Sequence, residues 1–455
     1  MVPSEEAFLE SLGEQCQTVI GDTDSDDAFT LGAILPLTES DGSPDVRGEQ
    51  RKLAMAHALS QINLLEGVKS RKFRVRICDT QSGWGSGDSD KAKAFAAYLI
   101  GSDEGIGAII SGASSDTTAI QTITKPAGIL LLSISATAIS LTHEDGEQLT
   151  WRMVSSDWFQ GTVLGEATRS CHQRITPDES PGIGVLGIMN VYGSSMWQVL
   201  QSLSGLTPGQ LLYYPVEIDK SNLDSMIAEM AGKGHSVVIV VGTTSMAAEV
   251  FQYYATSVLS ERPVIFLTDS NRNPEFLDLV EQSISLDRVY GTIPGAAEET
   301  NTYATFESTF NALEGVEPAQ GSFTAHSYDA IYCLALAHAY ALGSDDGEIN
   351  GPALVRGLRA LNGDTDEISS FSTHFTQIRS TLLDGGLVNV EGASGPLAFD
   401  EFGDLPSQVE LWNINDESGA GRRFETIGWI DIGGNEESGF LIENPSIFGE
   451  LCGGE

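Results

Sequence analysis

The sequence predicts an α/β protein whose strands form parallel sheets, and three observations support this fold class. Short apolar runs alternate with segments whose apolar residues recur at the helical period. Many of the apolar runs end in Ser, Thr, Gly or Asp, which is typical of strands that lead into helices. The alternation stops near residue 152 and then starts again, so we expect two α/β units of similar design.

The first unit is expected to begin with a buried strand, FTLGAIL, and to continue to residue 152. The expected strands are residues 29–35, 73–77, 108–110 and 129–132, and the expected helices are residues 48–63, 88–100 and 119–127.

The second unit repeats this alternation, and the chain then returns to helices. Its expected strands are residues 183–188, 210–214, 237–241, 264–267 and 289–293, and its expected helices are residues 159–170, 194–203, 223–232 and 247–257. Helices at 302–313, 326–342 and 354–361 and a strand at 409–414 follow.

Two hydroxyl-rich loops stand at the ends of successive strands of the first unit. Ser114 and Ser115 follow the strand at 108–110, and Ser135 and Thr137 follow the next strand. Ligands of parallel α/β sheets bind beyond the carboxyl ends of strands, where hydroxyl and N–H donors favour an anion such as a carboxylate. The alternative is that both clusters only cap helices, and the local pattern leaves both readings open.

Composition excludes several functions. The formal net charge is −40, so nucleic acid and anionic membrane surfaces are poor partners. The chain contains no apolar run of the length that spans a membrane. The first residues lack the basic and apolar parts of a signal peptide, so we expect either a cytosolic protein or one whose signal peptide has been removed.

Five cysteines are scattered along the chain without a CxxC pair, which argues against a zinc or redox motif. Cys16 and Cys452 lie in polar terminal segments and could form a disulfide if the protein is exported. Cys333 stands in an apolar helical pattern and is expected in the core.

An enzyme is the alternative from another class of protein, but its usual motifs are absent. The sequence contains no G-x-S-x-G, no H-E-x-x-H and no G-K-[ST]. His143 and His326 could approach a cleft, although a single histidine is more often structural. We therefore predict no catalytic residue, no metal site and no cofactor, and turnover of a substrate would contradict this.

The ordered segments together resemble the branched-chain amino-acid-binding family of type I periplasmic binding proteins. The resemblance covers roughly residues 29 to 430, and its segments are LGAILPLT, GEQRKLAMAHALSQIN, ISGASSDTTAIQTITKPAGILLLSISATAISLT, NVYGSSM, VVIVVGTTS, VIFLTDSN and ASGPLAFDEFGD. It implies two Rossmann-like lobes joined by three crossover strands near Arg152, Thr292 and Ser394, with a ligand trapped between the lobes by hinge closure.

The resemblance also implies which residues contact the ligand. Ser114 corresponds to a serine that binds the ligand carboxylate, Tyr192 covers the ligand, and Asp269 pairs with the ligand ammonium. Arg47 stands where the family often has an aromatic residue, and it could bind an acidic side chain or point into solvent. The full expected set is Arg47, Ser114, Ser115, Ser135, Ala136, Thr137, Tyr192, Thr243, Thr244 and Asp269.

Three residues depart from the family pattern, and two of them, Thr243 and Thr244, bear on the shape of the pocket. Thr243 and Thr244 occupy a place where an aromatic residue is common, and Ala113 replaces a cysteine that some relatives carry. Phe323 could also reach the cleft, with a core role as the alternative.

The resemblance implies the following organisation and function. We expect an acidic, solvated leader at 1–28, a first lobe of 29–152 plus 293–393, a second lobe of 153–292 plus 394–432, and a peripheral tail at 433–455. The expected protein is a monomeric, periplasmic or extracellular receptor, with lipid anchoring left open, that delivers an amino acid or a similar small polar ligand to the permease of an ABC importer. The alternative with the same fold is a small-molecule sensor that signals to a partner protein.

Overall fold

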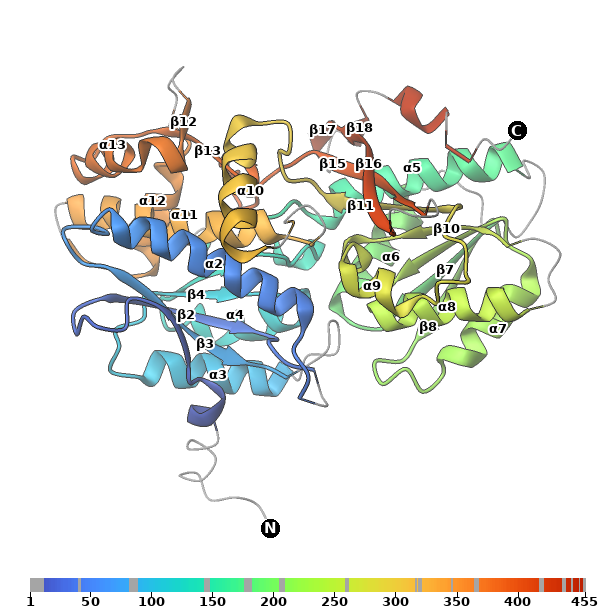
Figure 1. Cartoon of the computed structure of the whole chain (residues 1–455), viewed down its shortest axis with the longest axis horizontal. Helices are drawn as coiled ribbons and strands as arrows, with labels where there is room; N and C mark the ends of the chain where they lie inside the picture. Colours follow the sequence, from blue (N-terminus) through green and yellow to red (C-terminus); the bar gives the residue numbers. More distant parts are fainter. Residues whose placement is uncertain are drawn as a thin grey trace, which may run out of the picture.

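The computed structural model shows two lobes side by side, each built on one sheet (Figure 1). It describes residues 12–39, 42–81, 89–142, 148–175, 182–203, 209–257, 262–315, 317, 321–344, 347–363, 368–416, 421–435, 439–442, 445–449 and 451–452. The predicted α/β class with two Rossmann-like lobes is confirmed.

The first sheet has the strand order β1-β3-β2-β4-β5-β6, and all its strands except the edge strand β1 run parallel. Side chains alternate between its two faces, so that Ile109 packs on the opposite side from Ala108 and Ile110. Its strands are β1 (Thr18–Gly21), β2 (Phe29–Leu35), β3 (Phe73–Asp79), β4 (Ala108–Ser111), β5 (Leu130–Ser133) and β6 (Thr150–Arg152).

Helices cover both faces of the first sheet, with α2 and α3 on opposite sides (Figure 1). The most buried is α11 (Thr324–Gly343), which is apolar on all sides because it packs in the core of this lobe. The others are α2 (Val46–Leu64), α3 (Ser89–Gly101), α4 (Ser114–Thr124), α10 (Asn301–Glu314), α12 (Gly351–Arg359) and α13 (Phe371–Leu383). A short sheet of β12 (Ile368–Ser370), β13 (Asn389–Gly392) and β14 (Gly395–Pro396) follows this helical part.

The second sheet has the order β16-β15-β11-β10-β9-β7-β8, with β15 and β16 antiparallel to their neighbours. Its strands are β7 (Ile183–Ile188), β8 (Leu211–Val216), β9 (Val237–Val241), β10 (Val264–Leu267), β11 (Val289–Pro294), β15 (Val409–Asn415) and β16 (Arg423–Ile430). Its helices are α5 (Asp157–Ile175), α6 (Val191–Leu203), α7 (Leu223–Lys233), α8 (Thr244–Thr256) and α9 (Pro274–Leu279).

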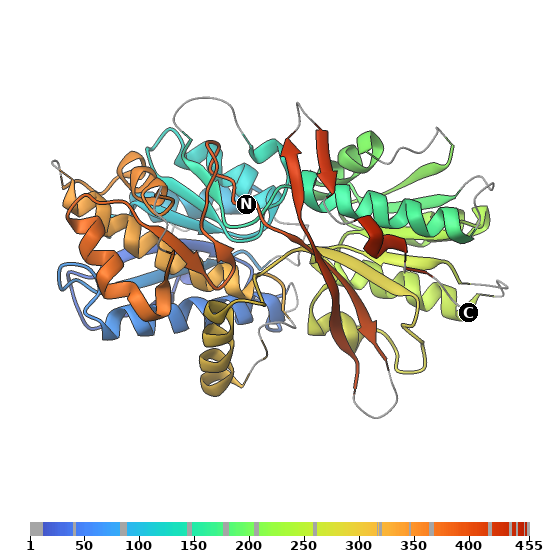
Figure 2. The ribbon, with the colours of Figure 1, turned by 90° about the horizontal axis from the view of Figure 1, so that it is seen from above.

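The chain passes between the two sheets three times, after β6, after β11 and before β15. Figure 2 shows β11 and the β15–β16 pair beside the junction of the lobes. Leu397, Phe399 and Leu405 still pack in the first core, so the third passage lies beyond Leu405 instead of near Ser394. The other predicted lobe boundaries stay predictions.

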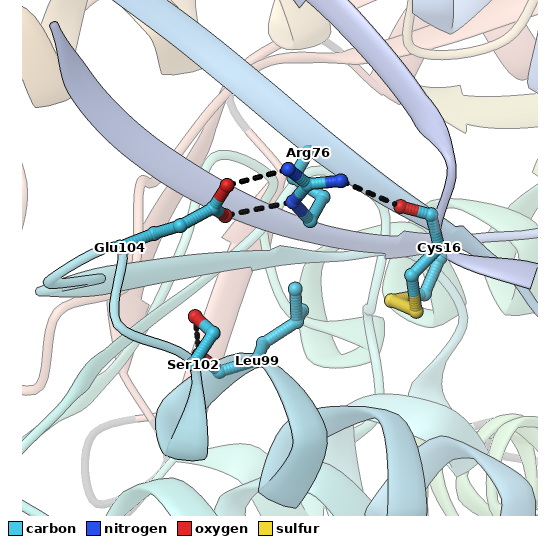
Figure 3. Close-up of a disulfide and its surroundings, with 6 residues drawn as sticks. Cys16, Arg76, Leu99, Ser102 and Glu104 are labelled. Carbon is cyan, nitrogen blue, oxygen red and sulfur yellow. Dashed lines mark hydrogen bonds and ion pairs between the residues drawn. A yellow bond between two sulfur atoms is a disulfide. The ribbon is translucent and has the colours of Figure 1, made fainter. Parts of the chain in front are cut away.

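The predicted solvated leader at 1–28 is wrong for the part that the structure describes. Residues Thr18–Gly21 form β1, which pairs with β3 and extends the first sheet. Cys16 is buried and bonded to Cys78, and its carbonyl accepts a hydrogen bond from Arg76, which also pairs with Glu104 (Figure 3). The prediction rested on the acidic composition of the segment and overlooked the short stretch TVIG, which pairs as an edge strand.

The predicted disulfide between Cys16 and Cys452 is also wrong, because each of these cysteines has another partner. Cys452 bonds to Cys171 of α5, 281 residues earlier. The described part of the tail includes β17 (Ile432–Asn435) and β18 (Gly439–Ile442), and Phe448 packs in the second lobe's core. The tail is therefore tied to this lobe instead of being peripheral to it.

The fifth cysteine, Cys333, is buried as a free thiol, which confirms its predicted place in the core. Among the described residues, none of the helices is both long enough and apolar enough to cross a membrane.

The disulfide pattern predicts a fixed pattern of thiol reactivity. Protein purified without reductant should take up no alkylating reagent when native, one equivalent when denatured, and five after reduction, because only Cys333 is a free thiol and it is buried. Intact-mass spectrometry measures each state. The Cys333→Ala variant should lose the single label, and a denatured parent that takes up three labels would contradict the pairing.

Candidate functional site

A pocket lies between the two lobes, at the carboxyl ends of strands from both sheets. In each sheet the strand order reverses once, between β2 and β4 in the first and between β7 and β9 in the second. Such reversals leave a crevice beyond the strand ends in which ligands bind. The pocket is lined by Ala113, Ser114, Ser115 and Ser135 from the first lobe and by Ile188, Asn190, Tyr192, Gly242, Asp269 and Ser270 from the second.

The first lobe presents hydrogen-bond donors to this pocket. The N-cap of α4 is Ala113, whose side chain cannot cap, so the first N–H groups of the helix lack a side-chain acceptor. The Ser114 Oγ accepts from the N–H of Ala138, and the Ser135 Oγ accepts from the Arg51 guanidinium at 3.1 Å. Each hydroxyl therefore keeps its own hydrogen for a ligand acceptor.

The second lobe presents a carboxylate. Asp269 follows β10 and is 5% exposed, and its Oδ1 accepts from the Tyr192 hydroxyl at 2.6 Å and from the Gln160 amide at 3.1 Å. Burial raises the pKa of Asp269, and these two hydrogen bonds oppose the shift. A buried carboxylate is stabilised by a cationic partner, so this side of the pocket favours a ligand cation.

The position of Tyr192 depends on the residues that flank it. Asn190 accepts a hydrogen bond from the N–H of Gly193 through its side chain, which holds the start of α6. A Cβ atom at position 193 would lie 1.9 Å from the carbonyl oxygen of Ile188, so only glycine fits there. Tyr192 and Gly193 thus lie inside the first turn of α6, which begins at Val191, and they are within the helix instead of before it.

The structure brings five of the ten predicted site residues together in the pocket lining, and the other five lie around it. Those in the lining are Ser114, Ser115, Ser135, Tyr192 and Asp269. Contact of any of the ten residues with a ligand stays a prediction.

Ala136 and Thr137 lie behind the lining. The N–H of Ala136 donates to the Ser133 Oγ at 3.0 Å and is used within the loop. Thr137 is fully buried, and its carbonyl accepts from the N–H of Asp157 in the second lobe. This second hydroxyl cluster caps no α-helix, because only the short 3-10 helix Ile139–Leu141 follows it.

Thr243, Thr244 and Arg47 have other partners. Thr243 is the N-cap of α8, since its Oγ1 accepts from the N–H of Met246. Arg47 is 3% exposed, which excludes the prediction that it points into solvent. Its Nη1 crosses between the lobes and donates to the Thr244 Oγ1 at 3.3 Å and to the carbonyl of Ser270 at 3.2 Å. Arg47 therefore connects the lobes.

Sequence reasoning missed three residues that organise the site. Arg51 is buried beside Ser135, and it lies one helical turn after Arg47 on α2. Gln160 holds Asp269, and Asn190 lines the pocket. The only signal for Arg51 was its place within an otherwise apolar helical face.

The remaining candidates from the sequence are His143 and His326. His143 lies outside the described residues. His326 is buried on α11, where burial and the charge of Arg51 lower its pKa to about 3. Across the parts of the chain that the structure describes, no group of three His, Cys, Asp or Glu side chains could hold a metal ion.

Asp157, the first residue of α5, gives a prediction about pH. Burial raises its pKa to about 7, and the hydroxyls of Ser195 and Thr137 oppose the shift. Between pH 4 and 7 the folded protein retains a proton that the unfolded chain has lost, so this group reduces stability as the pH rises. The Asp157→Asn variant should be more stable than the parent by about 2–4 kcal/mol at pH 8 and nearly equal at pH 4.

Chemical denaturation at pH 4, 6 and 8 measures this difference in the free energy of unfolding. Asp278→Asn is the matched control, because it makes the same substitution at an exposed position of α9. A difference between Asp157→Asn and the parent that is equal at all three values would show that the carboxyl does not titrate in this range.

Solved structures of low sequence identity share this fold. The branched-chain amino acid transporter substrate-binding protein of Streptococcus pneumoniae, in complex with isoleucine, is 16% identical with a TM-score of 0.65, and the match covers 88% of this chain and 99% of that one. A leucine-binding protein of Thermotoga maritima is 17% identical, with a TM-score of 0.67 and coverage of 88% and 98%. A solute-binding protein of an ABC transporter from Rhodopseudomonas palustris, in complex with 3,4-dihydroxybenzoic acid, is 15% identical, with a TM-score of 0.64 and coverage of 89% and 98%.

A search of curated protein sequences found no match. The family model described as periplasmic binding protein matches residues 28–381, which is well over half of the chain. Together with the two lobes and their sheets, this match shows that the chain belongs to the type I periplasmic binding protein family.

Proposed function

We propose that this protein is an extracytoplasmic receptor that traps an amino acid between its lobes and delivers it to an ABC importer. The observation that carries the proposal is the bipolar lining of the interlobe pocket. Ser114 and Ser135 present donors on one side, and Asp269 presents a carboxylate on the other. An α-amino acid carries a carboxylate and an ammonium on one carbon, which complements these two sides.

The ligand carboxylate would lie at the N-terminus of α4. There the uncapped N–H groups, the Ser114 and Ser135 hydroxyls and the helix dipole all favour an anion. The ligand ammonium would lie against Asp269, whose other partners, Tyr192 and Gln160, hold the carboxylate in place. Binding by such buried charged groups needs no covalent step.

Closure of the lobes is the second part of the proposal. Arg47 bonds to Thr244 and Ser270 across the cleft, and the N–H of Ile139 donates to the Ser195 Oγ at 2.9 Å from one lobe to the other. These contacts exist only when the lobes are together, so they favour the closed state. A ligand that contacts both lobes shifts the balance in the same direction.

The proposed location outside the cytoplasm is supported by two disulfides, Cys16–Cys78 and Cys171–Cys452. Disulfides persist in oxidising compartments such as the periplasm. In this proposal the protein acts as a monomer and passes its ligand to the membrane permease of the importer.

Removal of one charge or one donor tests the ligand's orientation. Asp269→Asn keeps the acceptor for Tyr192 but should weaken binding of an amino acid by about 2–4 kcal/mol, because the ammonium loses its buried partner. Ser114→Ala should cost about 1–3 kcal/mol. Calorimetry measures both variants against a panel of amino acids, with Asp278→Asn and Ser60→Ala as controls away from the pocket. Unchanged affinity in both site variants would refute the proposed site.

The role of Arg47 in closure is tested by scattering. Arg47→Gln removes a donor that spans the cleft, so the ligand-free protein should have a larger radius of gyration and bind its ligand more weakly, by about 1–3 kcal/mol. Small-angle X-ray scattering and calorimetry measure these quantities. Arg169→Gln is the control, since the ion pair of Arg169 with Glu166 lies within α5 and away from the cleft. An unchanged radius together with unchanged affinity would show that Arg47 does not hold the lobes together.

A further inference from the structure

A second cavity lies between the lobes and is distinct from the pocket of Ser114 and Asp269. Phe323, Thr324 and His326 contribute to its wall from the start of α11, and Arg272, Glu298 and Glu410 contribute from the other side. Phe323 has a φ of +64°, a conformation that is uncommon for a bulky residue and concentrates at functional sites.

Two polar side chains in this wall lack hydrogen-bond partners. Both ring nitrogens of His326 and the Oγ1 of Thr324 are buried without a partner among the described residues. Each side chain is only 2% exposed. Buried polar groups are nearly always hydrogen-bonded, because a buried group without a partner destabilises the folded protein. A group in the cavity could therefore bond to a ring nitrogen of His326, which donates or accepts, and to the hydroxyl of Thr324.

The second cavity adjoins the first pocket on both sides of the cleft. On the first lobe, Arg51 donates from Nη1 to Ser135 of the pocket, and its guanidinium lies 5.3 Å from the Phe323 ring of the cavity. On the second lobe, Gln160 donates to Asp269 of the pocket and to the carbonyl of Thr292, next to Ile293 of the cavity. Arg51 and Gln160 thus lie between the two spaces, and the end of a ligand anchored in the first reaches the second when these two side chains shift to make room.

The charged side chains around the cavity lie against one another. Arg272 pairs with Glu410 at 2.6 Å and lies 3.9 Å from Glu298, so a charged ligand end would lose its hydration here without gaining a counter-charge of its own. Burial and the charge of Arg51 lower the pKa of His326 to about 3, so its ring is neutral at pH 7. A neutral imidazole and a hydroxyl each donate and accept, which complements a neutral polar group such as an amide.

We propose that this cavity receives the distal end of the ligand's side chain, and that the ligand is an amino acid whose side chain ends in a neutral group that both donates and accepts hydrogen bonds. The inference rests on the proposed function and narrows its ligand class. His326 and Thr324 select the group through hydrogen bonds, and Arg272 and the two glutamates disfavour a fully charged end because they already neutralise one another.

The test compares side chains of similar length that differ at their ends. Glutamine and asparagine carry an amide, glutamate a negative charge, lysine a positive charge, and norleucine an apolar end. We expect at least one of the two amides to bind tenfold or more tightly than glutamate, lysine and norleucine, as measured by calorimetry with the full chain.

Substitutions in the cavity then test the two residues that are proposed to hydrogen-bond the amide of the ligand. Thr324→Val and His326→Leu should each reduce the preference for the amide over norleucine by tenfold or more. Because the removed groups have no partner in the structure, the melting temperature of the ligand-free variants should be unchanged or higher. The control is His338→Leu on the same helix, where the Nδ1 of His338 already bonds to the carbonyl of Leu334. This variant should lower the melting temperature and keep the preference.

The outcomes separate this inference from the proposed function. If the parent binds norleucine as tightly as the amides, the inference fails and the amino-acid receptor stands. If no amino acid binds, both fail. A full amide preference in Thr324→Val and in His326→Leu would overturn the inference, since the cavity would then hold only water. Should His326→Leu fail to fold, the nearly isosteric Thr324→Val decides.

Discussion

One geometric constraint determines where this protein can bind a ligand, namely that parallel strands bring all their carboxyl ends to one edge of a sheet. In both lobes the reversal of strand order opens a crevice at that edge. The two edges face each other, so that Ser114 after β4 and Ser135 after β5 lie opposite Tyr192 and Asp269 from the second lobe. The three passages of the chain join the two lobes and keep these edges together.

Burial of charge gives the cleft its selectivity. Asp269, Arg47 and Arg51 are all nearly inaccessible to solvent, and each depends on partners across or beside the cleft. Charged groups lose hydration when the lobes close, so closure is favourable only if a ligand or another side chain supplies matching charges and hydrogen bonds. This requirement links affinity, closure and the choice of ligand, and it is why the unsatisfied groups of the second cavity, His326 and Thr324, are informative.

The predicted elements of the sheets agreed with the structure because apolar runs such as Phe29–Leu35 and Val237–Val241 can only be buried strands at their length. The errors came from segments whose partners are distant in sequence. The strand Thr18–Gly21 is recognised only through its pairing with β3, and the sequence analysis predicted neither α13 nor β16. Cys16 and Cys452 were paired wrongly because sequence shows which cysteines exist and not which are adjacent.

The sequence by itself determined the α/β class, the two repeated units and the hydroxyl-rich loops at strand ends. Periodicity and turn chemistry depend on residues that are close together in the sequence. Family resemblance placed Tyr192 and Asp269 at the cleft. Only the tertiary structure decided which side chains meet. Arg47 contacts Thr244, Arg51 contacts Ser135, and His326 lines one cavity with Arg272 and Glu410. These contacts join residues up to 197 positions apart, and they arise from the packing of two lobes, which no local pattern specifies.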